Sequence, residues 1–385
     1  MRHLSSDPWG VAGTATTLPV PDRFTRSDAF SLTVEEELLL VHPVSFRPLG
    51  GTDALLARAR PPADQVRGGI SDGVLTLRTP RVRRAGDAVD VLAGLRAELA
   101  AFAPLLAAGV HPLGRVGESR LRPGPRHEEI ALSLGPLLHQ TPVCGVSVHV
   151  SMPDGETAVR ACNGMRAWIP LLQALGANSP YWYGRDSGLA STRAIICNSL
   201  PRAGLPRMFA DYADYTATVQ ELCFLGECPD PTFAWWDVRP NPERGTLEIR
   251  ALDAQSSLED LTALVALAHC LAVHEATADR PAPAPGPEAL RELSFRAARD
   301  GLGARLAVDG ALLPVREVTF RALAVAGAHA AELGCWDELS LVHRTVEAGN
   351  GAIRQRLNAE QGGVRLMLRR LADETTLRRP VACAA

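Results

Sequence analysis

The stretch that decides the fold is residues 31–42, SLTVEEELLLVH. Its composition predicts a β-strand, whose side chains alternate between two faces. Glu35 and Glu37 then share one face, and Glu36 lies with Val34 on the other. Two acids on one face repel each other unless a cation lies between them, and carboxylate oxygens are the ligands that Mg²⁺ prefers. The pattern therefore indicates either a metal site or an edge strand with solvated charges.

A second strand is predicted over Pro142–Ser151. His149 lies with Ser147 on one face of this strand, and valines occupy the other. A lone histidine in such a place is either a structural hydrogen-bonding group or a further metal ligand.

Two more strands are predicted on either side of an Asn-Pro turn. They are Phe233–Pro240 and Gly245–Leu252. If they pair, one face presents Asp237, Arg239, Glu248 and Arg250. This set is either a cross-strand ladder of ion pairs or a metal-binding acid beside arginines that bind phosphate or carboxylate. The Gly/Ser-rich loop Gly184–Arg193 adds backbone N–H groups and Arg193, which suit an anion but are a weak signal alone.

Helical periodicity and capping residues predict several helices, mostly in the last third of the chain. They are 87–109, 154–177, 257–277 and 288–377, with Asp154 and Ser257 as the N-caps of the second and third and an extended linker at 280–287. Strands concentrate in the first two-thirds, which favours an α+β fold over a doubly wound parallel sheet. We expect residues 1–29 to form an N-terminal arm, residues 30–377 a catalytic domain and residues 378–385 a tail.

Composition excludes several classes of protein. The 385 residues include no lysine, so the P-loop, protein-kinase and Schiff-base chemistries that need one are excluded. The net charge of −3 offers no basic field for nucleic acid or an anionic membrane. We find no signal peptide and no apolar run of membrane-spanning length, and we expect a cytoplasmic protein with reduced cysteines.

Several segments together resemble the glutamate–cysteine ligase type 2 family, also called carboxylate–amine ligases. In chain order they are TVEEELLLV, GVHP, VSVHVSMPD, ANSPYWYGRDSGLASTR, WWDVRP, GTLEIRALD, AARDGL and GNGAIRQR. The resemblance implies a curved antiparallel sheet of the glutamine-synthetase type with helices packed outside it. It also implies a reaction in which ATP phosphorylates a carboxylate and an amine then displaces phosphate, giving an amide, ADP and phosphate.

The resemblance also assigns roles to residues of this sequence. The implied metal ligands are Glu35, Glu37, His149 and Glu248; the catalytic residues are Glu248, Arg250 and Arg193; the nucleotide-binding residues are Arg239, Asp237 and Arg193. The expected cofactors are ATP and Mg²⁺, with Mn²⁺ as an alternative, and the expected partners are small amino acid and amine substrates. The oligomeric state stays open.

The sequence departs from the family pattern at the metal shell. Gly69 and Thr76 stand where relatives carry acids, and Asp72 would replace them only if its loop shifted. The activity is therefore expected to be weak or of shifted substrate. Two alternatives remain: a non-catalytic family member that binds nucleotide or amino acid as a partner protein, and an unrelated enzyme such as a phosphohydrolase.

Overall fold

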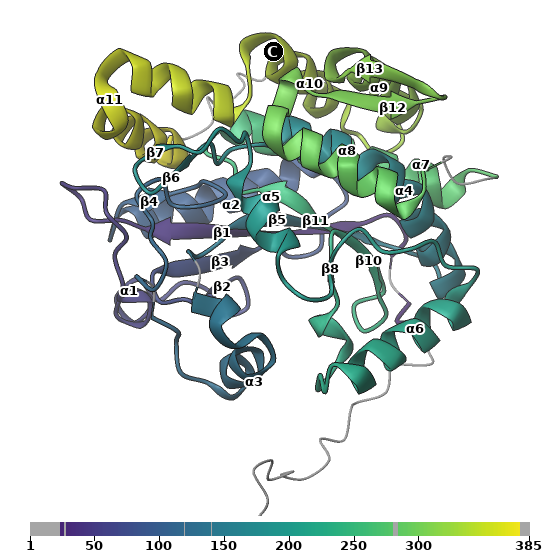
Figure 1. The fold of residues 1–385 in the computed structure, drawn as a ribbon, viewed down its shortest axis with the longest axis horizontal. Coiled ribbons are helices and arrows are strands. Elements are labelled where there is room, and N and C mark those ends of the chain that lie inside the picture. The colour runs from purple at the N-terminus through teal and green to yellow at the C-terminus, as the bar shows by residue number, and fades with distance from the viewer. Residues whose placement is uncertain (1–23, 27, 119, 140, 280–283, 378–385) are drawn as a thin grey trace, which may run out of the picture.

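A computed structural model of the chain describes residues 24–26, 28–118, 120–139, 141–279 and 284–377. At its centre lies a seven-stranded sheet in which every ladder is antiparallel (Figure 1). Across the sheet the strands are β10 (Val238–Asn241), β11 (Thr246–Asp253), β5 (Gly145–Ser151), β1 (Leu32–Leu40), β3 (Val74–Arg78) and β2 (Val66–Gly68), with β4 (Leu105–Leu106) added to β1. The predicted α+β fold with an antiparallel sheet is confirmed.

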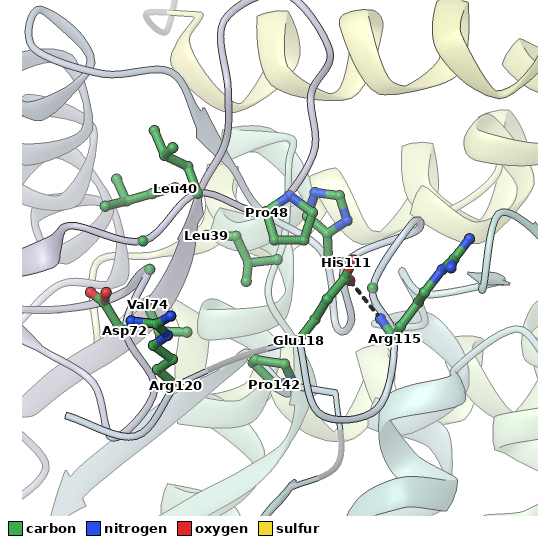
Figure 2. A pocket seen from close by; sticks show the side chains of 14 residues that line it. Leu39, Leu40, Pro48, Asp72, Val74, His111, Arg115, Glu118, Arg120 and Pro142 are labelled. Carbon is green, nitrogen blue, oxygen red and sulfur yellow. Dashed lines mark hydrogen bonds between the residues drawn. The ribbon is translucent and has the colours of Figure 1, made fainter.

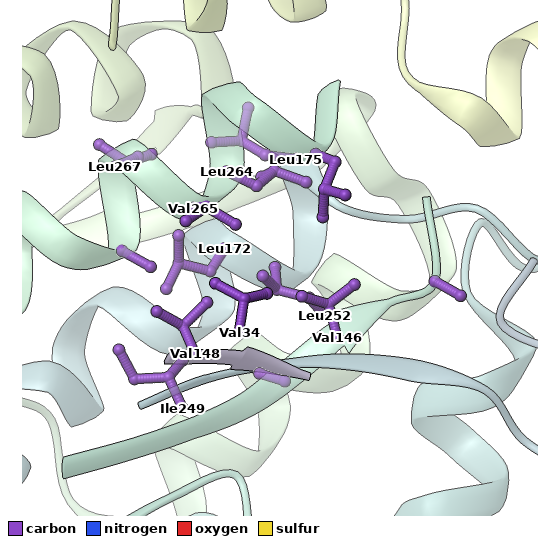
Figure 3. Packing of buried hydrophobic residues seen from close by; sticks show 14 of the residues in the cluster. Val34, Val146, Val148, Leu172, Leu175, Ile249, Leu252, Leu264, Val265 and Leu267 are labelled. Atoms are coloured by element: carbon purple, nitrogen blue, oxygen red, sulfur yellow. The ribbon is translucent and has the colours of Figure 1, made fainter. Parts of the chain in front are cut away.

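Helices cover one face of this sheet. The inner layer consists of α2 (Ala85–Ala100), α4 (Gly155–Leu175) and α7 (Leu258–Thr277). Figure 3 shows Val34, Val148 and Ile249 from the sheet packing against Leu172 of α4 and Leu264 of α7. These valines and isoleucines alternate with polar residues along each strand, so burial of the apolar set fixes which polar side chains face away from the helices.

An outer layer of helices packs on the inner one, and smaller elements flank the sheet (Figure 1). The outer layer consists of α8 (Pro287–Asp300), α9 (Val315–Ala330), α10 (Trp336–Ala348) and α11 (Gly351–Thr376). The flanking elements are α1 (Thr52–Ala59), α3 (Pro125–Leu134), α5 (Thr192–Asn198), α6 (Tyr212–Leu225), and the short strands β6 (Tyr181–Trp182), β7 (Arg185–Asp186), β8 (Ala203–Gly204) and β9 (Trp235–Trp236). None of the helices in the described part of the chain has the length and apolar character needed to cross a bilayer.

One charged residue breaks the apolar side of β1. Glu36 is fully buried and forms an ion pair with Arg96 of α2, whose side chain is also almost fully buried. Arg96 additionally donates hydrogen bonds to the backbone carbonyls of Gln255, Ser256 and Thr375. This ion pair joins the first strand to α2, to the chain before α7 and to the end of α11.

Three predicted elements need correction. The helix expected to reach Gly109 ends at Ala100. Leu105 and Leu106 instead form a short strand that pairs with β1, past the end of the ladder between β1 and β5. The strand expected from Phe233 is interrupted, since β9 pairs with β8 before β10 begins. The last third is not all helical: β12 (Arg305–Val308) and β13 (Ala311–Pro314) form a hairpin around an Asp-Gly turn with positive φ at both residues.

The predicted caps of two helices are confirmed. Asp154 accepts a hydrogen bond from the N–H of Thr157 at the start of α4, and Ser257 accepts one from Asp260 at the start of α7. In the predicted arm, the N–H of Thr25 donates to the carbonyl of Pro242 at 3.0 Å. The rest of the arm before residue 24, the linker residues 280–283 and the tail 378–385 lie outside the described residues.

Candidate active site

The sheet face opposite the inner helices carries rows of charged and polar side chains that come from neighbouring strands. In one row Arg239 lies opposite Glu248, which lies opposite His149. In the next row Glu35 lies between Ser147 and Arg78, and in a third Glu37 lies opposite Thr76, which lies opposite Arg67. The strand register therefore brings the acids and arginines of five strands onto one surface, which we call the polar face.

Glu248 lies between two guanidinium groups. Its Oε2 accepts from Arg239 at 2.9 and 3.0 Å, and its Oε1 lies 3.3 Å from Nε of Arg250. Burial alone would raise the pKa of Glu248, but Arg239, His149 and Arg250 together hold that pKa well below its usual range. Glu248 is therefore ionised throughout the neutral range and fixes both arginines in place.

Glu35 is surrounded by three arginines. Its carboxylate lies 2.7 Å from Arg244, 3.5 Å from Arg67 and 3.6 Å from Arg78. Burial works to raise its pKa, yet nearby His149, Arg244 and Arg67 lower it overall. Sequence reasoning missed all three arginines, because only the pairing of β1 with β3 places Arg78 beside Glu35.

His149 is buried between Glu248 and Glu35. Its Nε2 lies 3.3 Å from Nη1 of Arg244 and must accept, because a guanidinium group only donates. The proton of the neutral ring then sits on Nδ1, a buried atom with no hydrogen-bond partner among the described residues. Burial lowers the pKa of His149 despite the two neighbouring carboxylates, so the ring is neutral.

Glu37 differs from the other two glutamates of this face. It accepts a hydrogen bond from the N–H of Gly145 at 3.0 Å, and it has no ion pair within the described part of the chain. Burial raises its pKa, which shows that the nearby positive charges of Arg193 and Arg250 do not fully offset its desolvation. A buried carboxylate in this state is stabilised by any further cation that reaches it.

The predicted metal ligands fit a divalent ion only in part. In the described residues, no three His, Cys, Asp or Glu side chains converge as ligands of one ion. The oxygens of Glu35 and Glu248 face guanidinium groups, so an ion there would have to displace an arginine. Glu37 has no such competitor and fits a cation. Asp72 does not serve this site, because it caps α1 by accepting from the N–H groups of Gly51 and Thr52.

Arg193 and the loop before it are built around an acid that the sequence analysis did not single out. Asp253, at the end of β11, accepts hydrogen bonds from Ser179 and Ser191 and from the N–H of Asn178. Arg193 lies beside it, with Nη1 4.0 Å from Asp253 and Nη2 donating to the carbonyl of Arg250. In the Gly/Ser loop expected to bind an anion, Ser191 is thus engaged with Asp253 and Ser187 donates to the carbonyl of Pro180, and the loop holds Arg193 beside Arg250.

Asp237 lies just before β10, near Arg193 and Arg250 but without an ion pair to either within the described residues. Burial raises its pKa to about 6, and the two arginines only partly oppose this. The charge of Asp237 therefore changes close to neutral pH.

A cavity of about 280 Å³ continues the polar face beyond Glu37 and Thr76. Its floor includes Leu39, which follows Glu37 on the same side of β1, and Figure 2 shows Asp72, His111 and Glu118 around it. Burial lowers the pKa of His111 to about 4, and its Nε2 has no partner among the described residues. The cavity is close to the lower end of the size range of small-molecule sites.

Comparison with known proteins agrees with this geometry. Residues 32–373 match the model of glutamate-cysteine ligase family 2. The chain is 35% identical to a putative glutamate–cysteine ligase 2-1 of Rubrobacter xylanophilus over 90% of this chain and 94% of that one, and 35% identical to a glutamate–cysteine ligase of Halobacterium salinarum over 73% and 81%. Its fold resembles the crystal structure of a Francisella tularensis glutamate–cysteine ligase in complex with AMP, with a TM-score of 0.67, 13% identity and coverage of 93% and 92%.

Proposed function

The chain belongs to glutamate–cysteine ligase family 2 and is a ligase, and on that premise we propose that it uses ATP to join the carboxylate of an amino acid to an amine. The observation that carries the proposal is the polar face, where Glu248 holds Arg239 and Arg250 in fixed positions. Bidentate guanidinium groups suit phosphate and carboxylate oxygens, which are the groups that this reaction brings together.

The proposed reaction has two steps. A carboxylate oxygen attacks the terminal phosphorus of ATP, and the bond to the ADP oxygen breaks. The amine nitrogen then attacks the acyl carbon, phosphate leaves and the nitrogen loses its proton. Both steps gather negative charge, so preorganised cations supply most of the catalysis and no covalent nucleophile is needed.

The residues divide this work between them. Arg250 and Arg193, joined through the Arg250 carbonyl, are the residues proposed to hold the transferred phosphoryl group and the substrate carboxylate, and the ion pair with Glu248 supports the orientation of Arg250. Arg239 and Asp237 are the proposed nucleotide contacts. Mg²⁺, when bound, would offset the charge of the phosphate groups.

The metal ligands belong to the same proposal. Glu37 would hold the ion first, because no arginine competes for its carboxylate. Glu35, His149 and Glu248 stay predicted ligands that an ion would reach by displacing a guanidinium group. The substrates are expected to be small amino acids and amines, and the cytoplasmic location stays a prediction.

The product nucleotide tests this route. The purified protein with ATP, Mg²⁺ and a panel of amino acids and amines should release ADP and phosphate, in amounts that depend on both a carboxylate and an amine and match an amide found by mass spectrometry. AMP and pyrophosphate as main products would contradict the acyl-phosphate route. Nucleotide binding without turnover would instead support the non-catalytic alternative.

A further inference from the structure

The three arginines around Glu35 are more than this carboxylate needs. Three formal positive charges face one negative charge, and none of the three has a second carboxylate within 4.0 Å among the described residues. The side chains of Arg67, Arg78 and Arg244 are 63%, 41% and 31% exposed, whereas Glu35 is 13% exposed beneath them. The cluster thus presents donors to solvent above an acid that is already paired.

The arginines converge from both sides of the polar face. Arg67 and Arg78 come from β2 and β3, and Arg244 comes from the turn between β10 and β11. Arg244 is steadied by its 2.7 Å contact with Glu35 and by His149. The strand register therefore holds three guanidinium groups around one point, although the segments that carry them are far apart in sequence.

This arrangement has an unrelieved electrostatic cost. Arg244, Arg67 and Arg78 lie 2.7, 3.5 and 3.6 Å from the single carboxylate of Glu35, so the repulsion among three guanidinium charges is only partly offset by one negative charge. A bound anion would turn this repulsion into attraction, and guanidinium groups bind phosphate oxygens in a bidentate manner. A cation at the same place would add to the repulsion.

We propose that Arg67, Arg78 and Arg244 form a binding site for the phosphate groups of the nucleotide that works without a divalent ion at Glu35. The inference rests on the proposed function and specifies how the phosphates are held: arginines take the place of one metal ion.

Calorimetric titration with ADP in the presence of EDTA tests the site. The wild-type protein should bind ADP without metal, and the variant with Arg78→Gln and Arg244→Gln should bind about tenfold more weakly or worse, because charge-assisted hydrogen bonds are lost. Arg369→Gln removes the same charge from an exposed position on α11 and should leave binding within about twofold. The single variant Arg67→Gln changes the most exposed member and should weaken binding without changing the thermal midpoint.

The variant Glu35→Gln tests whether the charge of Glu35 restrains the three arginines. If Glu35 mainly restrains the arginines, its loss frees them and ADP binds more tightly in EDTA. If ADP binds only with Mg²⁺ and the arginine variants bind as the wild type does, the inference is overturned while the proposed ligase function stands. If ADP binds neither with nor without Mg²⁺, the proposed function itself is contradicted.

Discussion

At the scale of single residues, Glu248 is the group on which the site depends most directly. Glu248→Gln keeps the shape of the side chain and one oxygen that accepts from Arg239, so the fold should be retained. The variant loses the charge that orients Arg250 and that would attract a metal ion, and turnover should fall about a hundredfold or more. ADP release measures the rate, and circular dichroism checks the fold.

A matched control for this variant lies on the same hairpin. Glu243→Gln neutralises an exposed acid in the turn between β10 and β11 and should leave turnover unchanged. Turnover of Glu248→Gln close to that of the wild type would show that the ion pairs of Glu248 are only a structural ladder.

Asp237 should make stability depend on pH. Its pKa is about 6 in the folded protein against a usual 3.8, so the folded state holds this proton more tightly than the unfolded state does. The resulting stabilisation is complete below about pH 3.8 and is lost as pH rises through about 6. Asp237→Asn should therefore be more stable than the wild type at pH 8, by about 1–3 kcal/mol, and equally stable at pH 4.

Urea unfolding at both pH values measures this difference. Glu243→Gln is again a suitable control, since it should change the free energy of unfolding by the same small amount at pH 4 and at pH 8. A stabilisation by Asp237→Asn that is equal at pH 4 and pH 8 would mean that the carboxyl group is not buried with a raised pKa.

At the scale of elements, the register of β1, β2 and β3 decides where a metal ion can be added. Thr76 lies opposite both Glu37 and Arg67, so Thr76→Glu would place a second carboxylate next to Glu37. We expect this variant to reach half-maximal activity at a several-fold lower Mg²⁺ concentration, because hard cations are selected by charge and by oxygen ligands. A Mg²⁺ titration measures this, and an unchanged requirement would contradict an ion at Glu37.

The other position with a missing acid offers a contrast. A Cβ atom at Gly69 would come within 2.8 Å of Cγ1 of Val74. Gly69→Glu should therefore lower the thermal stability of the protein without lowering its Mg²⁺ requirement. Thermal unfolding of Gly69→Glu and Thr76→Glu measures the difference in stability between the two variants.

The ion pair between Glu36 and Arg96 makes a prediction about the inner layer. Arg96→Met leaves a buried, unpaired carboxylate and should cost about 3–5 kcal/mol of stability. Adding Glu36→Leu removes that charge and should recover a large part of the loss. Recovery should stay incomplete by about 1–3 kcal/mol, because Arg96 also satisfies three backbone carbonyls. Urea unfolding of the single and the double variant measures these free energies. If Arg96→Met were as stable as the wild type, the prediction would be contradicted.

At the scale of the whole molecule, local patterns predicted the elements better than the contacts between them. Alternation along β1 and the caps at Asp154 and Ser257 were sufficient for the strand and both helices, since these signals lie within one segment. The arginines around Glu35 were missed because their meeting depends on the register of five strands. The motifs quoted for the resemblance contain Glu248 and Arg250 but carry no information on which groups hold them.

The bond between Arg96 and Thr375 has a consequence for how the protein is made. The two residues are 279 positions apart, and the hydroxyl of Thr375 also accepts from the N–H of Ala107 beside β4. A nascent chain therefore cannot complete the interior behind its first strand until the last helix has been translated. For most of its synthesis β1 lacks this support, so aggregation of the partly made chain is the hazard that the cell must manage. The residues of the polar face, from Glu35 to Arg250, are thus all translated before the helix that completes the interior behind them.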